Sequence, residues 1–198
     1  MDIPTEKIDQ VNKQCYDNCA DYWDRFPFKK LLPHMIHDSY DEKLGNRVLD
    51  IGSGTGILAK WMKDQGFDVL CIDPSLEMVK RCRKKGLNTL QQRIQDFESE
   101  DQFAMVFAIL SLIHVPKNEM PREIEKISSL MPKGGTLFLG MIGGTSEGIE
   151  ERRSGYPRFF SKYTVSDLEK LTRKYFTVTK SHTLNGHTQY LLLSLSKK

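Results

Sequence analysis

The chain has 198 residues and a formal net charge of +3, with 39% hydrophobic and 28% charged residues. This is the composition of an ordinary soluble domain that can bury its own core, and so small a charge gives no argument for a nucleic-acid partner. The longest nearly apolar run, residues 103–113, is far shorter than the roughly 20 residues of a membrane-spanning helix. The N-terminus lacks the basic start and apolar core of a secretory signal, so we expect a cytoplasmic protein with no membrane partner.

The cysteines give no sign of a metal site. Cys15, Cys19, Cys71 and Cys82 form no C-x-x-C pair, and Cys15 and Cys19 have no histidine near them in sequence. Free thiols in a reducing compartment are therefore favoured over zinc ligands, and we expect no metal.

Two helices are predicted before the first strand, over residues 5–25 and 28–37. In the first, apolar positions recur at spacings of three and four, which is typical of an amphipathic helix. We expect residues 1–45 to form a helical cap. The cap either packs on the sheet or acts as a lid that places its aromatic side chains over a ligand.

Residues 48–56 carry the strongest pattern of the chain. An apolar run is followed by Asp50, by glycines at 52, 54 and 56, and by an amphipathic segment, which predicts a strand, a tight turn and a helix over 56–65. Glycines allow a ligand close to the backbone, and the helix N-terminus favours an anionic group. A dinucleotide fingerprint requires a third glycine at position 57, where Ile57 stands.

A second strand, residues 67–72, ends at Asp73. An acid about 20 residues beyond such a glycine turn is placed to accept hydrogen bonds from the ribose of a nucleotide cofactor. The alternative role is helix capping, by Asp73 or Ser75, of a predicted helix over 75–85.

The next elements are a third strand over 89–92 and a fourth over 103–109. The stretch between them is so short that the usual helix is predicted to be short or missing. The fourth strand is apolar throughout, as expected for a central parallel strand buried on both faces.

The C-terminal third predicts a helix over 117–130, a strand over 136–141 and a helix over 165–175 that opens with a capping box at Thr164 to Asp167. Residues 143–163 show no clear periodicity, so we expect a long loop above the carboxyl edge of the sheet. Asn185-Gly186 between two β-rich runs predicts a terminal hairpin.

The pattern Asp50-x-Gly52-x-Gly54-x-Gly56 resembles motif I of the class I S-adenosylmethionine-dependent methyltransferases. The acids after strands 2 and 3, the glycine turn at 131–140 and the terminal hairpin stand in that family's order. The resemblance implies an α/β, Rossmann-like three-layer fold with a mostly parallel seven-stranded sheet that ends in an antiparallel hairpin. It also implies one domain over residues 1–198, with a cap (1–45) and a cofactor-binding core (46–198).

The family resemblance also implies a cofactor, S-adenosylmethionine, and a product, S-adenosylhomocysteine. In the family, an acid after strand 3 recognises adenine and an apolar neighbour packs on the ring, which points to Asp96 with Phe97 or Ile94. The implied cofactor-binding residues are Asp50, Gly52, Ser53, Gly54, Gly56, Asp73, Pro74, Gln95, Asp96, Phe97 and Leu110.

Residues 110–116 resemble the sLxHxP segment of many small-molecule methyltransferases, so we expect a small-molecule acceptor. The chain lacks the Asn/Asp-Pro-Pro-aromatic and Pro-Cys motifs of enzymes that methylate bases, which argues against nucleic acid. His114 is the candidate general base, since its ordinary pKa is near 6.5; the alternative is a structural tether. The candidate acceptor-binding residues are Tyr16, Tyr22, Arg158, Phe160 and Tyr163.

Two other functions stay open. One is a non-catalytic S-adenosylmethionine-binding subunit of a larger assembly. The other is an NAD(P)-dependent oxidoreductase, which Ile57 and the terminal hairpin argue against. We expect a monomer or a homodimer.

Overall fold

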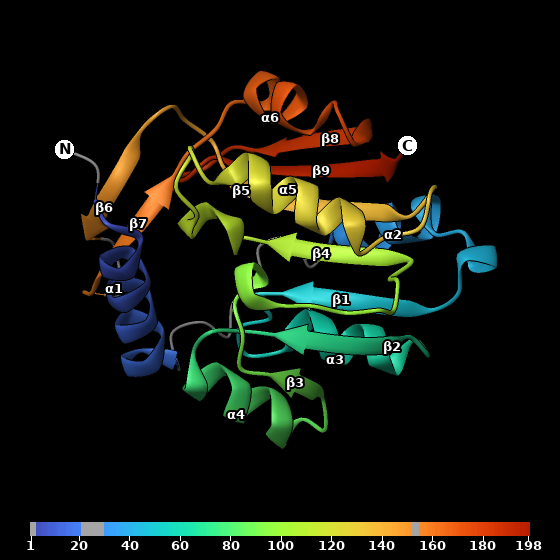
Figure 1. Cartoon of the computed structure of the whole chain (residues 1–198), viewed down its shortest axis with the longest axis horizontal. Coiled ribbons are helices and arrows are strands. Elements are labelled where there is room, and N and C mark those ends of the chain that lie inside the picture. Colours follow the sequence, from blue (N-terminus) through green and yellow to red (C-terminus); the bar gives the residue numbers. More distant parts are fainter. Residues whose placement is uncertain (1–2, 21–29, 152–154) are drawn as a thin grey trace.

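The computed structural model of the chain describes residues 3–20, 30–151 and 155–198 (Figure 1). Seven strands form one sheet in the order β3-β2-β1-β4-β5-β9-β8. The first five in this order run parallel, β9 pairs antiparallel with β5, and β8 pairs antiparallel with β9. The strands of this sheet are β1 Arg47–Ile51, β2 Asp68–Ile72, β3 Asn88–Leu90, β4 Met105–Ile109, β5 Thr136–Ile142, β8 Phe176–Leu184 and β9 Tyr190–Lys197.

Helices cover both faces of this sheet, so the predicted three-layer α/β fold is confirmed. The order of the strands reverses between β1 and β4, and open α/β sheets bind ligands beside the carboxyl ends of the strands at such a switch point. The helices are α1 Thr5–Asn18, α2 Leu32–Ser39, α3 Ile57–Asp64, α4 Leu76–Lys84, α5 Met120–Ser129 and α6 Val165–Thr172, with short 3₁₀ turns η2 Glu42–Leu44, η3 Ile94–Asp96 and η4 Leu112–His114.

The core is divided by the sheet into two apolar layers, because side chains of a strand alternate between its faces. In β4, Val106 faces the layer covered by α5 and α6, whereas Phe107 faces the layer covered by α2, α3 and α4. Phe107 stacks on Phe138 of β5 with ring centroids 4.8 Å apart. Every residue of β5 is buried, as the predicted double coverage of the central parallel strands requires.

The two N-terminal helices take different positions. α1 lies over the carboxyl ends of β1, β2 and β4, where the arrowheads of these strands point (Figure 1). α2 packs on a face of the sheet through Leu32, Met35 and Ile36, so only α1 has the place expected of a cap. α2 buries its apolar stripe because spacings of three and four put these side chains on one side of the helix.

The boundaries of these helices differ from the expectation. α1 ends at Asn18, before the predicted end at residue 25, and α2 begins at Leu32 rather than at residue 28. Local periodicity continues through Cys19, but that residue caps the helix with a non-helical backbone. No helix in the described ranges is long and apolar enough to cross a membrane.

The expectation of a long loop over residues 143–163 is wrong. Strand β6, Glu147–Glu151, pairs antiparallel with β7, Pro157–Ser161, as a separate two-stranded sheet. β6 alternates between exposed and half-buried residues, and β7 is buried from Arg158 onward against α1 and η4. Flanking glycines and charges hide this hairpin in the sequence, because β7 gains its burial only from distant segments.

Three other local predictions are confirmed. Only η3 lies between β3 and β4, so the usual helix is missing there. Thr164 and Asp167 form the expected capping box at the start of α6. The terminal hairpin is present, with β9 inserted antiparallel beside β5, although its connection spans residues 185–189 rather than the Asn-Gly pair alone.

Candidate active site

A cavity of ≈ 1260 Å³ lies at the carboxyl ends of the parallel strands, under α1. One side, here called the glycine-turn wall, consists of residues 50–55, 73–75 and 91–96. The opposite side, here called the hairpin wall, consists of Asn12, Tyr16, His114, Arg158, Phe160 and residues 184–188. The tip of β4, at Leu110, lies between them.

The three glycines of the turn have positive φ, at +66° for Gly52, +55° for Gly54 and +77° for Gly56. A β-carbon at Gly52 would lie 2.4 Å from Ser111 Cβ, and one at Gly56 would lie 2.6 Å from Leu87 Cδ1. At Gly54 a β-carbon would meet no atom within 4 Å, and this residue lines the cavity beside Ser53. Gly52 and Gly56 are therefore required by packing, whereas Gly54 keeps a concave backbone open to a ligand.

Asp73 is tied to the glycine turn through the backbone. Its carboxylate accepts hydrogen bonds from Gly54 N at 2.8 Å and from Ser75 N at 2.9 Å. Ser75 in turn is the N-cap of α4, because its hydroxyl accepts from Met78 N. Burial raises the pKa of Asp73 to about 7, against the lowering effect of these two N–H donors. Each carboxylate oxygen keeps a lone pair for a further donor from the cavity.

Asp50, at the end of β1, is buried and lines the cavity. Its Oδ2 has no hydrogen-bond partner in the described part of the chain. Burial raises the pKa of this carboxyl to about 8. A buried polar atom without a partner costs free energy, so a cationic or N–H donor from a ligand has a place to bind here.

The loop after β3 contributes Ile94, Gln95 and Asp96 to the cavity. Asp96 is exposed, and the Arg93 guanidinium, 2.9 Å from its Oδ2, lowers the pKa of that carboxyl. Phe97 is 2% exposed and packs in the core beside Phe103, so it does not line the cavity. Of the two apolar residues considered for this loop, Ile94 is the one that faces the ligand space, as Pro74 does on the neighbouring loop.

Leu110, at the tip of β4, has φ +57° and is the one non-glycine residue with positive φ in the described ranges. Its N–H donates to Gly140 O at 2.9 Å, which holds the turn against β5. A bulky residue in this conformation costs roughly 1–2 kcal/mol, and such strain is found most often at functional sites.

On the hairpin wall, His114 and Tyr16 form one hydrogen-bonded unit. His114 Nδ1 lies 2.6 Å from Phe159 O, and since a carbonyl only accepts, Nδ1 carries the proton. His114 Nε2 then accepts from Tyr16 OH at 2.7 Å. Burial lowers the pKa of His114 to about 3 and raises the pKa of Tyr16 to about 12. Both groups are therefore neutral near pH 7, and the lone pair of His114 is engaged by Tyr16.

Arg158 and Phe160 of β7 complete this wall. Arg158 Nη1 donates to Tyr16 OH at 3.2 Å, and its guanidinium lies 4.8 Å from the centroid of the Phe160 ring. Tyr163 is buried and does not line the cavity; its ring lies 5.1 Å from Lys117 Nζ. Tyr22 lies outside the described residues.

Sequence reasoning missed Asn12, whose Oδ1 accepts from Phe159 N at 2.9 Å. Asn12 is buried on the same face of α1 as Ile8 and Cys15, at spacings of four and three. A polar residue in an apolar stripe is the signal that could have found it, because a buried amide needs a partner. Asn12 and His114 together attach α1 and η4 to the backbone of β7.

The profile of the methyltransferase domain family matches residues 19–179. The match covers most of the chain, and the fold is that of the Rossmann-like class I enzymes. The chain therefore belongs to the methyltransferase domain family.

Curated relatives include ubiquinone biosynthesis O-methyltransferases from Xanthomonas campestris pv. campestris, 35% identical over 109 residues. The match takes in 51% of this chain and 45% of the relative, so the chain spans about half the length of the curated relatives it matches.

Solved structures show the same fold at low identity. The 1,6-didemethyltoxoflavin-N1-methyltransferase of Burkholderia thailandensis, with bound 1,6-didemethyltoxoflavin and S-adenosylhomocysteine, is 18% identical with a TM-score of 0.79. The alignment covers 100% of this chain and 93% of that one. The N-methyltransferase NodS of Bradyrhizobium japonicum, in complex with S-adenosylhomocysteine, is 16% identical with a TM-score of 0.73, covering 94% and 98%.

Proposed function

We propose that this protein is an S-adenosylmethionine-dependent methyltransferase that acts on a small-molecule acceptor. The observation that carries the proposal is the open backbone at Gly54, between the unpartnered Oδ2 of Asp50 and the buried carboxylate of Asp73. These groups suit a ligand with a cationic amine at one end and a ribose beside it. When bound, S-adenosylmethionine supplies a methyl carbon made electrophilic by the adjacent sulfonium.

The glycine-turn wall offers a partner for each part of that cofactor. Asp50 and the backbone of Gly52 to Gly54 would hold the amine and carboxylate of the methionine part. Asp73 would hold the ribose hydroxyls, as an acid at the end of β2 does in nucleotide-binding sheets. Asp96 would accept from the adenine amine, and Ile94 would pack on the ring. Pro74, Gln95, Ser53 and Leu110 also line this space.

The hairpin wall would bind the acceptor. It lies across the tip of β4 from the glycine turn, at the end of the sheet over which α1 lies (Figure 1). Tyr16, Arg158 and Phe160 present a hydroxyl, a cation and an aromatic face. These groups suit a small aromatic or acidic acceptor. The Burkholderia enzyme, with its bound 1,6-didemethyltoxoflavin, supports a small molecule by analogy of fold.

The main contribution of the protein to the reaction is then orientation. Holding two reactants in a near-attack geometry supplies roughly 7–11 kcal/mol of a barrier. In this arrangement His114 holds the hydroxyl of Tyr16 in place and is not a free base, since its Nε2 already accepts a hydrogen bond from that hydroxyl. An acceptor that must lose a proton requires a base with an available lone pair within hydrogen-bond reach.

Thermal unfolding with excess S-adenosylmethionine, S-adenosylhomocysteine or NAD tests the cofactor. A ligand at about 100 times its Kd adds about 2.7 kcal/mol of apparent stability. We expect stabilisation by the first two and none by NAD, with loss of the effect in Asp73→Ala. Asp68→Ala is the matched control, because Asp68 is an exposed acid at the opposite end of the same strand. Stabilisation by NAD alone would overturn the proposal.

Methyl transfer itself separates an enzyme from a non-catalytic subunit. Labelled S-adenosylmethionine is incubated with the protein and a panel of small aromatic and acidic acceptors. Transfer that is lost in Asp73→Ala and kept in Asp68→Ala supports the enzyme. Cofactor binding without transfer to any member of a broad panel would favour the non-catalytic subunit.

A further inference from the structure

We propose that Asp17 is a positioning residue that fastens α1 to the cofactor loop and thereby aligns the two walls of the site. The inference rests on the proposed function, because it assigns the cofactor to the glycine-turn wall. Asp17 does not touch the reacting atoms. It acts through Ser75 on one side and through its neighbour Tyr16 on the other.

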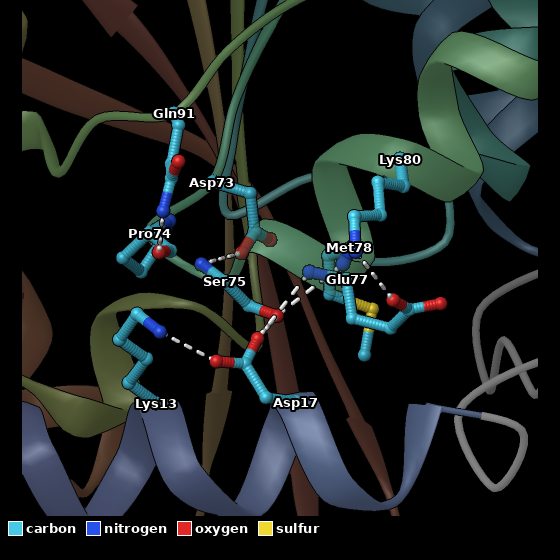
Figure 2. Close-up of polar contacts among 9 residues, drawn as sticks. All are labelled: Lys13, Asp17, Asp73, Pro74, Ser75, Glu77, Met78, Lys80 and Gln91. Carbon is cyan, nitrogen blue, oxygen red and sulfur yellow. Dashed lines mark hydrogen bonds and ion pairs between the residues drawn. The ribbon is translucent and has the colours of Figure 1, made fainter.

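The contacts of Asp17 cross from α1 to α4 (Figure 2). Its Oδ1 accepts from Ser75 Oγ at 2.6 Å and from Glu77 N at 3.3 Å, while Oδ2 lies 2.5 Å from Lys13 Nζ. Ser75 also donates its N–H to Asp73 Oδ1. One polar chain therefore runs from the glycine turn through Asp73 and Ser75 to α1.

The helix dipoles favour the contact of Asp17 with α4 over its position within α1. It lies in the last turn of α1, where no basic residue is found and where the helix dipole disfavours an acid. Across the gap it meets the N-terminus of α4, where the dipole favours one. Although partial burial raises the pKa of Asp17, hydrogen bonds from Lys13, Ser75 and Glu77 outweigh it and hold that pKa below the usual value.

Polar contacts determine how α1 is seated, because few of its apolar residues are buried. Only Ile8, Asn12 and Cys15 of α1 are buried. Asp9 pairs with Arg93 of the glycine-turn wall, and Asn12 accepts from the backbone of β7. A helix held by such contacts can separate from the site at a smaller cost than one held by a large apolar area.

Tyr16 and Asp17 are consecutive, yet they bind opposite walls. Tyr16 hydrogen-bonds to His114 and Arg158 on the hairpin wall, and Asp17 hydrogen-bonds to Ser75 on the loop of Asp73. Because they are adjacent in α1, binding of one residue to its wall also brings the other residue close to its own partners. A cofactor that orders the Asp73 loop therefore also orders the acceptor-facing hydroxyl of Tyr16. We therefore expect loss of the Asp17 contacts to speed the release of the cofactor product.

The test measures release of S-adenosylhomocysteine by stopped-flow displacement. Asp17→Ala removes both hydrogen bonds to the N-terminus of α4, from Ser75 and Glu77, so release should be about tenfold faster or more. Asp17→Asn keeps an oxygen that accepts from Ser75 and Glu77, and release should stay within about threefold of the wild-type rate. Asp64→Ala is the matched control, since Lys60 and Asp64 form the same i,i+4 ion pair at the end of α3, and we expect no change.

Hydrogen exchange of the wild-type protein provides a second readout that needs no variant. Saturating S-adenosylhomocysteine should slow exchange of the α1 amides, while exchange in α6, none of whose residues lines the cavity, stays unchanged. The inference would be overturned if Asp17→Ala released the ligand no faster than Asp64→Ala, or if Asp17→Asn released it as fast as Asp17→Ala. It would also be overturned if the ligand added no protection to the amides of α1. Failure of the wild-type protein to bind S-adenosylhomocysteine would instead overturn the proposed function.

Discussion

The glycine-turn wall and the hairpin wall face each other across one cavity but are built differently. The contacts of the first are local and largely from the backbone: Gly54 N and Ser75 N bind Asp73 from 19 and 2 residues away. The contacts of the second are made by side chains from distant segments: Tyr16 and His114 are 98 residues apart, and Asn12 binds the backbone of Phe159 from 147 residues away. A backbone-built wall serves a constant ligand, and a side-chain-built wall can change its ligand through few substitutions.

The largest effect is expected at the glycine turn, where two neighbouring glycines should separate folding from binding. Gly54→Ala places a methyl group in the open cradle, and S-adenosylhomocysteine should bind at least about 100-fold more weakly, while the left-handed backbone costs only about 1–2 kcal/mol of stability. Gly52→Ala adds a clash with Ser111 and should lower the free energy of unfolding by about 2–5 kcal/mol.

Calorimetric titration and denaturant unfolding of both glycine variants measure the two effects. The comparison fails if Gly54→Ala binds the ligand as the wild type does, or if Gly52→Ala is no less stable than Gly54→Ala. The first result would mean that the cradle at Gly54 is not where the ligand lies, and the second that packing against Ser111 does not require a glycine at position 52.

The next effect concerns the proton on Asp50. Because burial raises its pKa to about 8, this carboxyl is mostly protonated in the free protein at pH 7 and must ionise to bind an ammonium group. Binding of S-adenosylhomocysteine should therefore release protons, and its affinity should rise by up to about tenfold from pH 6 to pH 7. Titration calorimetry at pH 7 in two buffers of different ionisation enthalpy measures the release.

Asp50→Asn is the control for this proton, and it should bind more weakly with less proton release. The pH dependence of folding stability has the opposite sign to that of ligand affinity. A carboxyl whose pKa is raised in the folded state stabilises the ligand-free protein below about pH 4 and loses that contribution as pH rises through 8. Equal proton release in the wild type and Asp50→Asn would remove Asp50 from the cofactor site.

On the hairpin wall, His114 should behave as a neutral tether. Its ring should stay unprotonated on Nε2 down to pH 5, as nitrogen-15 NMR of the imidazole would show, because its pKa is lowered to about 3. His114→Ala leaves the Tyr16 hydroxyl and Phe159 carbonyl without their partner and should cost about 1–3 kcal/mol of stability. S-adenosylhomocysteine should bind within about threefold of the wild-type affinity.

The pH dependence of stability gives the same residue a second test. A histidine whose pKa is lowered on folding contributes stability above about pH 6.5, and that contribution is lost as pH falls toward 3. The wild type should therefore lose more stability than His114→Ala between pH 7 and pH 4. A ring that titrates near pH 6.5 in the folded protein would restore His114 as a candidate base.

The smallest effect is expected at Asp96, the exposed member of the glycine-turn wall. Asp96→Ala should weaken S-adenosylhomocysteine binding by less than about tenfold, because exposed carboxylates contribute little free energy in water. Glu98→Ala is its control, since that residue is also an exposed acid in an ion pair, with Lys126. Loss of more than about 100-fold would show that the ligand buries Asp96 and that the wall closes further around adenine.

The parts of the molecule that sequence reasoning predicted correctly depend on neighbours in the chain. The glycine turn, the capping box of α6 and the terminal hairpin each follow from a few adjacent residues with special backbone preferences. The mostly parallel seven-stranded sheet was expected from the family resemblance, and the structure has it. Asp73 was located from its distance to the turn, and the structure places it in contact with Gly54.

The parts that were mistaken depend on distant neighbours. The phenylalanines of β7 become a buried strand only because α1 and η4 lie against them, and nothing in residues 143–163 encodes those partners. Phe97 and Asp96 are adjacent, yet one turns into the core and the other to solvent, which depends on the place of Phe103. Tyr163 likewise belongs to the core rather than to the cavity.

By itself, the sequence determined the fold class, the glycine turn and the acid that follows it, because local backbone conformation is encoded locally. Only the tertiary structure decided that α2 packs on a face of the sheet instead of joining the cap. It also decided that Tyr16 donates to the lone pair of His114 and that Asp17 joins α1 to the Asp73 loop. The physical reason is that burial and pairing depend on what the folded chain places nearby. A histidine near the reaction centre becomes a base or a tether according to the partner that folding gives it.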